Sequence, residues 1–368
     1  MAKINLISGF LVLLYASIIC THATDTISVN QIVRYNETII SPLETFELGF
    51  FCPGNSTNHY VGIWYKKIST RTVLWVANRN TPLTDTFSEL TLTLQGVLVL
   101  WNTTTGNVVW SSTNSSTNSV KNLIAQLLDT DNFIIYNEGD VINQENPIWQ
   151  SFDFLTYTLL PGMKHGKDLV TGIERHLTSW KSADDPASGE FSDWIDTNGY
   201  PQLIIRQGRE IMFRGGPWNG LSFTGTPNLK KNRFYNITFV INQREIYFQY
   251  NVTDASVLSR LVLQPSGRSE GLLWVDSKQE WSVYTAPQID CCGQYAVCGP
   301  YGICNINSSP ICSCLKGFEP TSPEPWKNTD WSQGCRHTIP LDCNPEEGFK
   351  KYSNLKLPDT QGLGLTRP

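Results

Sequence analysis

The alternation of apolar and polar residues along the chain predicts many short β-strands. From residue 24 to about residue 150, aromatic and β-branched runs such as Phe46–Phe51 are separated by clusters of Gly, Pro, Asn and Ser. Leu90, Leu92 and Leu94 alternate with polar residues, which is the period-two pattern of a strand with one buried face. No segment of this region carries a helical period. The pattern therefore predicts an all-β domain.

The same strand pattern continues from about residue 148 to residue 287. Glu190–Ile195 and Glu245–Tyr250 combine aromatic and β-branched residues in runs of strand length. Gly215–Gly220 has the composition of an obligate turn, and Gly199–Pro201 has that of another. Tryptophan and tyrosine are frequent in this region, and these side chains bury large areas where one sheet packs on another. The sequence predicts a second β-rich domain here.

The first residues have the composition of a secretory signal peptide. One positive charge at Lys3 precedes the apolar stretch Ile4–Cys20, and Thr21–Ala23 then offers the small residues that a signal peptidase reads. A membrane anchor is the alternative, but the apolar run is short for a span of about 20 residues. We expect cleavage after Ala23 and export from the cell. No other stretch approaches the length of a membrane span, so we expect no transmembrane helix in this chain.

Composition and charge exclude one class of partner. At 368 residues the chain is long enough for about two to three domains. Hydrophobic residues make up 40% and charged residues only 17%, so the chain can build cores but has little charge to keep its surface soluble. Glycans are one candidate for that role. The net charge of −5 offers no positive footprint for nucleic acid, which we exclude as a partner.

The cysteines and the asparagine sequons both indicate an extracellular protein. Of 10 cysteines, eight lie between Cys291 and Cys343, as in a small domain whose core needs disulfides. Seven Asn-x-Ser/Thr acceptors predict a glycosylated surface on which only some sites are occupied. The candidate glycosylation sites are Asn36, Asn55, Asn102, Asn114, Asn236, Asn251 and Asn307. Asn114 falls in the polar run Thr113–Ser119, which we expect to be a surface loop.

Several motifs together resemble the modules of one protein family. Phe46–Phe51 and Trp75–Arg79 resemble a bulb-type lectin domain, and Trp149–Asp153 and Gly216–Gly220 look like the S-locus glycoprotein domain that follows it. Downstream, Cys292–Cys304 with its Cys-Gly-Pro-Tyr-Gly run is similar to an EGF-like module. Residues 334–335, 341–343 and 356–360 look like the opening of a PAN/apple domain. The motifs run in the right order, and the chain resembles the ectodomain of plant S-locus-type (G-type lectin) receptor kinases.

The resemblance implies a mainly β architecture of several modules. A signal peptide at residues 1–23 would precede a bulb-type lectin β-prism at residues 24–150 and a β-rich S-locus glycoprotein domain at residues 151–287. A small disulfide-rich EGF-like module would follow at residues 288–336, and a truncated PAN/apple start with a tail at residues 337–368. The family carries a cytoplasmic Ser/Thr kinase, but this sequence has neither a glycine-rich ATP loop nor a His-Arg-Asp catalytic loop.

A mannose site of the bulb-lectin type is incomplete in this sequence. Such sites resemble Gln-x-Asp-x-Asn-x-Val-x-Tyr, in which four polar side chains bind sugar hydroxyls. The best match here is Leu128-x-Thr130-x-Asn132-x-Ile134-x-Tyr136, so Asn132 and Tyr136 are the candidate sugar contacts. Two lost polar contacts, at roughly 1–3 kcal/mol each, are enough to abolish weak binding. We therefore favour a lectin fold kept as a scaffold over a working mannose site.

The resemblance also implies how the cysteines pair. The EGF-like order of first with third, second with fourth and fifth with sixth implies Cys292–Cys304, Cys298–Cys312 and Cys314–Cys335. Cys52, Cys291 and Cys343 are left without an assigned partner, and both an intermolecular bridge and a free thiol remain open. No paired Cys-x2-Cys knuckles accompany His337, so we expect no zinc site, and the sequence indicates no other metal or cofactor.

The sequence favours a recognition protein over an enzyme. The five histidines fall in no catalytic motif, so we assign no catalytic residue. The family implies an extracellular module that binds a secreted peptide or a small apolar elicitor in pollen recognition or immune-type signalling, as a homodimer or with a related receptor. One alternative is a soluble carbohydrate-binding lectin. Another is a fragment of a receptor Ser/Thr kinase whose kinase domain lies outside this chain.

Overall fold

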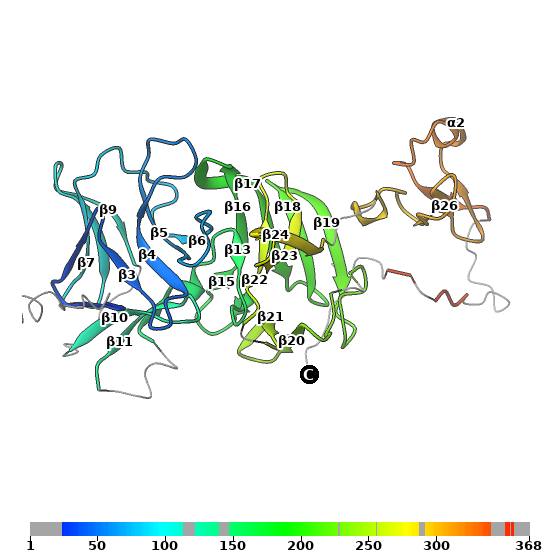
Figure 1. Cartoon of the computed structure of the whole chain (residues 1–368). Coiled ribbons are helices and arrows are strands. Elements are labelled where there is room, and N and C mark those ends of the chain that lie inside the picture. The colour runs from blue at the N-terminus through cyan, green and yellow to red at the C-terminus, as the bar shows by residue number, and fades with distance from the viewer. Residues whose placement is uncertain are drawn as a thin grey trace, which may run out of the picture.

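Three bodies of β-structure follow one another along the chain (Figure 1). The computed structural model describes residues 24–112, 122–139, 147–226, 229–254, 256–286, 291–339, 350–353, 355 and 356. Within these residues the strands form six four-stranded sheets and two two-stranded sheets. The expected signal peptide at residues 1–23, the expected loop at Thr113–Ser119 and most of the expected PAN/apple start lie outside the described residues.

The first body, which we call the first prism, contains three four-stranded antiparallel sheets in the part that the structure describes. One sheet consists of four strands that are consecutive in the chain. Each of the other two sheets joins one strand that precedes these four to three strands that follow them. The strands, sheet by sheet, are β3 (Thr38–Ile40), β4 (Phe46–Phe51), β5 (Tyr60–Tyr65) and β6 (Val73–Val76); β2 (Ile32–Arg34), β7 (Ser88–Leu92), β8 (Leu98–Asn102) and β9 (Asn107–Ser111); β1 (Thr26–Ser28), β10 (Leu123–Leu127), β11 (Phe133–Asn137) and β12 (Trp149–Gln150).

The second body repeats this plan and is called the second prism below. Its outermost sheet joins one early strand to a late three-strand meander, as β1 joins β10–β12 in the first prism. The strands, sheet by sheet, are β16 (Leu177–Ser182), β17 (Asp185–Asp196), β18 (Gln202–Gln207) and β19 (Glu210–Pro217); β15 (Glu174–Arg175), β14 (His165–Asp168), β21 (Glu245–Val252) and β20 (Tyr235–Ile241); β13 (Thr158–Leu159), β22 (Ser259–Leu263), β23 (Ser269–Val275) and β24 (Glu280–Thr285). A short 3-10 turn, η2 (Ser151–Asp153), connects the two prisms.

One tryptophan from each sheet meets in the core of the first prism. Trp75, Trp110 and Trp149 lie on β6, β9 and β12, which are the last strands of their sheets. Their ring centroids are 5.9 to 6.2 Å apart and the rings are edge-on to one another. Edge-to-face pairs add about 0.5–1.5 kcal/mol beyond the area they bury, so this triad holds the three sheets together at one point.

The alternation predicted from the sequence is confirmed in most strands and wrong at two places. Leu90 and Leu92 are fully buried, but β7 ends at Leu92 and Leu94 is 67% exposed in the following turn. Gly215–Gly220 is not a turn throughout, because β19 continues to Pro217. Gly215 is required inside this strand, since a Cβ there would lie 3.0 Å from the Cβ of Leu203 on the neighbouring strand.

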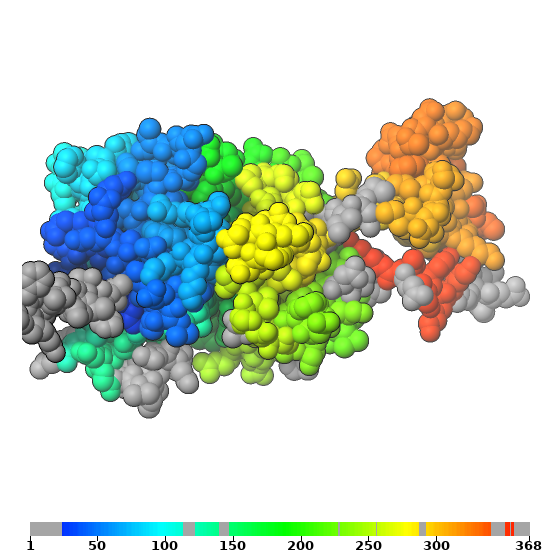
Figure 2. Space-filling view, in the orientation of Figure 1, coloured from blue at the N-terminus to red at the C-terminus, as the bar shows by residue number. Residues whose placement is uncertain are grey.

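The two prisms share an apolar interface. Phe51, Trp64 and Val73 of the first prism form a buried cluster with Trp180 of the second, and Tyr157 packs against it. This cluster covers the outer face of the β3–β6 sheet, whose inner face lies in the main core with Leu48. In the space-filling view the blue surface of the first prism lies directly against the green and yellow surface of the second (Figure 2).

Arg79 ties the prisms together through the backbone. Its guanidinium donates hydrogen bonds of 2.8 to 3.2 Å to the carbonyl oxygens of Pro186, Thr178 and Ser179. Burial lowers the pKa of Arg79 to about 10, which leaves the side chain charged at neutral pH. The side chain of the neighbouring Asn78 stabilises the loop, because it accepts a hydrogen bond from the Val61 amide and donates one to the Thr81 carbonyl oxygen. The Trp75–Arg79 motif therefore shapes a loop and clamps it onto the second prism.

The third body is small and is held by disulfides. It contains β25 (Gly302–Cys304), β26 (Cys312–Cys314), β27 (Phe318–Pro320), β28 (Cys335–His337), the 3-10 turn η3 (Cys291–Gly293) and α2 (Pro323–Lys327). Disulfides link Cys292 to Cys304, Cys298 to Cys312 and Cys314 to Cys335, which is the pairing that the resemblance implies. Each contributes about 2–4 kcal/mol in a module with so little apolar core. The Tyr295 amide donates to the Met212 carbonyl at 3.0 Å, which attaches this body to β19.

Candidate functional site

The side chain of Asn132, a candidate sugar contact, is bonded within the protein. Its Nδ2 donates to Gln150 Oε1 at 2.9 Å, and its Oδ1 accepts from the Ser151 hydroxyl and the Phe152 amide at 3.3 Å each. The chain of bonds continues, because Gln150 donates to Asp153 and Asp153 pairs with Arg175 of the second prism at 2.6 Å. Asn132 thus anchors the connection between the prisms.

Tyr136, the second candidate sugar contact, also has an internal partner. Its hydroxyl donates to Gln126 Oε1 at 3.0 Å, and Gln126 in turn donates to Asp25 at 2.6 Å. Tyr136 is 9% exposed, whereas Thr130, where the sugar motif has an Asp, is exposed. A sugar at this place would have to displace the bonds of both Asn132 and Tyr136, which costs roughly 1–3 kcal/mol for each group left unpaired.

Asp131 lies between Thr130 and Asn132 in the sequence and is fully buried. Its φ of +75° places it in the left-handed region, which Asn and Asp adopt more readily than other side chains that carry a Cβ. Neither carboxyl oxygen has a hydrogen-bond partner among the described residues. Burial raises the pKa of Asp131 well above its usual range. A carboxyl group that is fully enclosed cannot reach a sugar, so Asp131 does not replace the missing carboxylate of a sugar site.

An open groove lies on the β3–β6 sheet beside the interface of the prisms. It has a volume of about 380 Å³ and is lined by Tyr35, Thr38, Glu47, Trp64 and Arg71, together with Asn36, Glu37, Phe50, Phe51 and Cys52. The indole of Trp64 donates to Glu47 Oε2 at 2.8 Å, and the Arg71 guanidinium lies 4.7 Å above the centre of the Trp64 ring. This surface combines an acid, a cation and aromatic rings, as polar ligand sites do.

The sequence analysis did not identify this groove. Asn36 is named there as a sequon and Cys52 as a surplus cysteine, while Phe46–Phe51 is named as a strand and a family motif but not as part of a site. A usable signal was present in β4, where Glu47, Gly49 and Phe51 alternate with core residues and so share the outer face. Gly49 lets Thr38 and Trp64 pack closely over this face, because a Cβ there would lie 2.8 Å from Thr38 Cγ2 and 3.2 Å from Trp64 Cη2.

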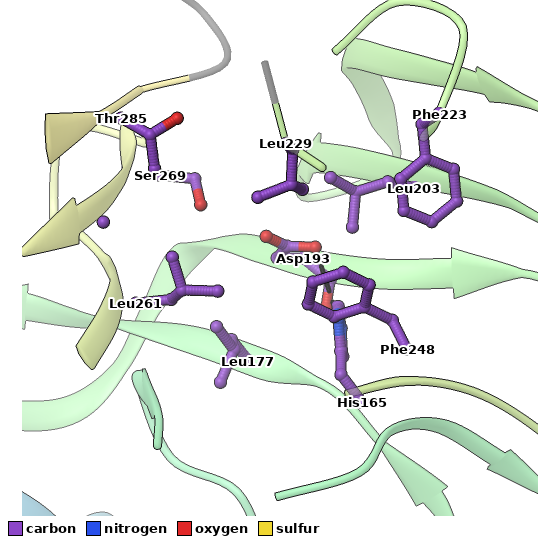
Figure 3. Close-up of a pocket in the computed structure, with 11 residues that line it drawn as sticks. His165, Leu177, Asp193, Leu203, Phe223, Leu229, Phe248, Leu261, Ser269 and Thr285 are labelled. Atoms are coloured by element: carbon purple, nitrogen blue, oxygen red, sulfur yellow. Dashed lines mark hydrogen bonds and ion pairs between the residues drawn. The ribbon is translucent and has the colours of Figure 1, made fainter. Parts of the chain in front are cut away.

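A small cavity lies inside the second prism (Figure 3). It has a volume of about 30 Å³, enough for a water but not for a ligand. His165 and Asp193 lie next to each other in its wall, and leucine and phenylalanine side chains make up much of the rest. His165 Nε2 donates to the Asp193 carbonyl oxygen at 2.9 Å, so its Nδ1 carries no proton when the ring is neutral.

Burial shifts the pKa values of both titratable groups of this cavity, Asp193 and His165. It raises the pKa of Asp193 to about 8, an effect that a hydrogen bond from Ser269 reduces in part. It lowers the pKa of His165 to about 4, against a smaller opposing effect of the hydrogen bond to the Asp193 backbone. At neutral pH both groups are therefore uncharged. The cavity is an internal feature of the second prism and not a candidate for ligand binding.

The predicted glycosylation sites are mostly at the surface. Asn36, Asn55, Asn251 and Asn307 are exposed, whereas Asn102 and Asn236 are half-buried. Asn114 lies outside the described residues. Accessible amides are a requirement for glycan attachment, so these four exposed sites remain the strongest predictions.

The surplus cysteine Cys52 is a free thiol at the end of the groove. Of the cysteine side chains that the structure describes, that of Cys52 is the one outside a disulfide. It is half-buried, and its sulfur lies 2.9 Å from His59 Nδ1. Cys343 and the side chain of Cys291 lie outside the described part. The sulfurs of Cys298, Cys304 and Cys312 lie close together, but each belongs to a disulfide and so cannot act as a thiolate ligand. In the described chain, no helix has the length and hydropathy of a membrane span.

Two models of protein families match the chain. Residues 72–181 match a D-mannose binding lectin domain, and residues 213–322 match an S-locus glycoprotein domain. The first match includes Trp75–Arg79 and Asn132, and the second includes the cysteines of the first two disulfides.

Curated relatives match over most of the chain. The S-locus-specific glycoprotein S6 of Brassica oleracea is 38% identical over 91% of this chain and 77% of its own length. The receptor-like serine/threonine-protein kinase SD1-8 of Arabidopsis thaliana is 39% identical over 94% of this chain, which spans 40% of that kinase. A G-type lectin S-receptor-like serine/threonine-protein kinase, SRK of the same plant, is 40% identical, and the chain spans 38% of it.

Solved structures match at low scores. The mannose-specific agglutinin of snowdrop bulbs is 15% identical, covers 30% of this chain and 88% of its own, and has a TM-score of 0.24. A monomeric mannose-binding lectin from Gastrodia elata is 16% identical, covers 35% of this chain and 96% of its own, and has a TM-score of 0.26. Scores of this size support no assignment.

Proposed function

This chain belongs to the S-locus glycoprotein family, and on that premise we propose that it is an extracellular recognition module that binds a secreted ligand in pollen recognition or immune-type signalling. The observation that carries the proposal is the match to S-locus glycoproteins over 91% of the chain. The ligand class that we propose is a secreted peptide or a small apolar elicitor.

The architecture suits a platform that presents surfaces to a ligand. The prisms are locked together by the Arg79 clamp, by the Asp153–Arg175 ion pair and by the aromatic cluster around Trp64 and Trp180. Rigid platforms bind with a smaller loss of conformational entropy than flexible ones. We propose that the third body acts as a stalk and as a contact for a second copy or a related receptor.

We propose that the protein acts outside the cell after removal of residues 1–23. The three disulfides of the third body fit an oxidising compartment, and four described sequons are exposed. Sequencing of the N-terminus of the secreted protein tests cleavage after Ala23. Recovery of the chain from the cytosol with reduced thiols and no sugar would contradict the location.

A soluble mannose-binding lectin is the alternative that the lectin-domain match raises. The internal bonds of Asn132 and Tyr136 disfavour it, because a sugar would have to break them. A glycan array with the wild-type protein and with the Asn132→Ala and Tyr136→Ala variants separates the two functions. Mannose binding that both substitutions abolish would establish the lectin and overturn the scaffold interpretation.

A second alternative concerns the length of the protein. The chain spans about 40% of the receptor kinase SD1-8, so the recognition module of a longer kinase is a natural reading. The kinase activity would then belong to a domain outside this chain. Sequencing of the transcript beyond Pro368 decides this point directly.

The central experiment is a ligand search with the secreted chain as bait. The purified protein is incubated with extracellular fluid from pollen-bearing and from pathogen-treated plant tissue, and bound peptides and small molecules are identified by mass spectrometry. Each identified compound is then titrated by calorimetry, with a Kd below about 10 μM (about −7 kcal/mol) expected for a specific ligand. Failure of every compound to bind saturably would reject the recognition function.

A further inference from the structure

The groove of the first prism contains a glycosylation sequon. Asn36 lies in the tight turn between β2 and β3, and Thr38, the hydroxyl residue of the same sequon, is the first residue of β3. Both residues line the groove. Asn36 is exposed and has a φ of +74°, a left-handed conformation in which the side chain of the turn residue projects from the surface. This sequon therefore lies at a groove of the surface.

The groove offers the contacts that a sugar ring uses. Tyr35 lines the groove with a half-buried ring, whose centroid lies 6.1 Å from that of Phe50, a residue packed against the main core. Glu47 and Arg71 both contact Trp64, since Glu47 accepts a hydrogen bond from the indole N–H and Arg71 lies over the ring. Glu47 can accept hydrogen bonds from hydroxyl groups and from an acetamido N–H, while Arg71 can donate to sugar oxygens. The apolar faces of sugar rings pack on aromatic rings such as these.

We propose that this groove holds the first sugars of the chain's own Asn36-linked glycan. In the attachment step, Asn36 Nδ2 bonds to the anomeric carbon of an oligosaccharide carried on a lipid diphosphate. The bond from that carbon to the diphosphate oxygen breaks, the lipid diphosphate leaves, and the amide nitrogen gives up one proton. The N-acetylglucosamine joined to Asn36 then lies over Tyr35, with the next sugar between Glu47 and Arg71.

Attachment favours the chain's own glycan over a free ligand. The groove is open and shallow, and its polar side chains are already partly bonded, so its affinity for a free sugar is low: a Kd of about 1 mM, or about −4 kcal/mol. A sugar tethered at the rim has an effective concentration of several millimolar, which fills the groove about four-fifths of the time. The glycan would then cover the open part of the outer face of β3–β6, beside the part that the second prism covers.

The free thiol of Cys52 provides a direct measure of occupancy. Cys52 lines the groove, so a glycan in the groove slows its reaction with a bulky maleimide. The full secreted chain is labelled under native conditions, and the rate is measured on the Cys52 peptide by mass spectrometry. Removal of the Asn36 glycan should accelerate labelling about fivefold, the inverse of the unoccupied fraction. Asn36→Asp is the variant of choice, because Asp tolerates the left-handed turn.

Matched variants separate the glycan from other effects. Thr38→Ala removes the sequon and should accelerate labelling, whereas Thr38→Ser keeps the sequon and should not. Asn307→Asp removes an exposed sequon in the third body and should leave the rate unchanged. Glu47→Gln and Arg71→Ala leave the Asn36 sequon intact but weaken the contacts, so they should accelerate labelling without loss of glycan mass.

Two results would overturn the inference. One is an unmodified Asn36 in the secreted protein. The other is a Cys52 labelling rate that is the same in the wild type and in both variants that lack the sequon. A rate that responds to Asn36→Asp but not to Glu47→Gln or Arg71→Ala would show a glycan that shields the thiol without binding the groove, and this too rejects the proposal. None of these outcomes depends on the ligand search, so the two proposals fail separately.

Discussion

Replacement of Asp193 by Asn tests whether a buried, uncharged acid limits the stability of the second prism at alkaline pH. Asp193 has a pKa of about 8 in the folded protein, against 3.8 for an unperturbed Asp, because burial penalises the carboxylate. The folded state thus binds a proton that the unfolded state releases. The stability that this proton provides is complete below pH 3.8 and is lost as the pH rises toward 8.

His165 acts in the opposite direction over a different range. Its pKa is about 4 in the folded protein against an unperturbed 6.5, so the prism loses stability as the pH falls from 6.5 to 4. The two effects offset each other in that range, since one proton is bound on folding and one is released. Above pH 6.5 only Asp193 of this pair titrates. Over the 1.5 units from 6.5 to 8, at about 1.4 kcal/mol per unit, the wild type should lose about 2 kcal/mol relative to Asp193→Asn.

The measurement is denaturant unfolding followed by tryptophan fluorescence at several pH values between 6 and 8. The difference between the variant and the wild type cancels the contributions of other groups, including buried Asp131. The control is Asp276→Asn, because Asp276 is exposed in the same prism and its replacement should leave the pH dependence unchanged. A constant difference between Asp193→Asn and wild type across this range would refute the assignment of a neutral Asp193.

Three further predictions concern the contact between the prisms, the packing within the first prism and the disulfides of the third body. Arg79→Met should destabilise the packing of the two prisms by about 2 kcal/mol or more, because carbonyl oxygens at the interface lose their donor, and limited proteolysis should detect it while exposed Arg209→Met should not. Gly62→Ala should cost about 1–3 kcal/mol in a thermal melt, because the new Cβ would lie 2.6 Å from the Trp75 carbonyl oxygen and 2.7 Å from the Phe51 ring; an unchanged melting temperature would contradict the close packing. Reduction of the disulfides should unfold the third body and leave the sheet signal of both prisms in circular dichroism, and loss of that signal would show that the bodies depend on one another.

Local features of the sequence account for most strands and for the cysteine framework. Alternation identifies strands such as β4 and β21 because the period of two is a property of a few consecutive residues. The family resemblance supplied the pairing of the six cysteines, which spacing alone leaves open. The error at Gly215–Gly220 has a long-range cause, since Gly215 packs against Leu203 of the neighbouring strand and β19 continues to Pro217 before the chain turns.

The candidate sites were harder to predict because their partners are distant in sequence. Asn132 matches a sugar-binding motif, yet its amide bonds to Gln150, 18 residues away, and the network ends at Arg175 in the other prism. The groove joins Tyr35, Glu47 and Arg71 from separate turns and strands of one sheet. No periodicity in the chain indicates such a combination.

The sequence by itself determined that this protein is a β-rich member of its family with a disulfide-held module, because strand periodicity, motif order and cysteine spacing are written in consecutive residues. Only the tertiary structure decided that the second domain is another three-sheet prism, that Asn132 connects the prisms, and that His165 lies next to Asp193 in the wall of a closed cavity. The physical reason is that the hydrogen bonds and the charge of a polar side chain depend on which other residues bury it from water. Sheets that pack against each other set those surfaces across more than a hundred residues of chain.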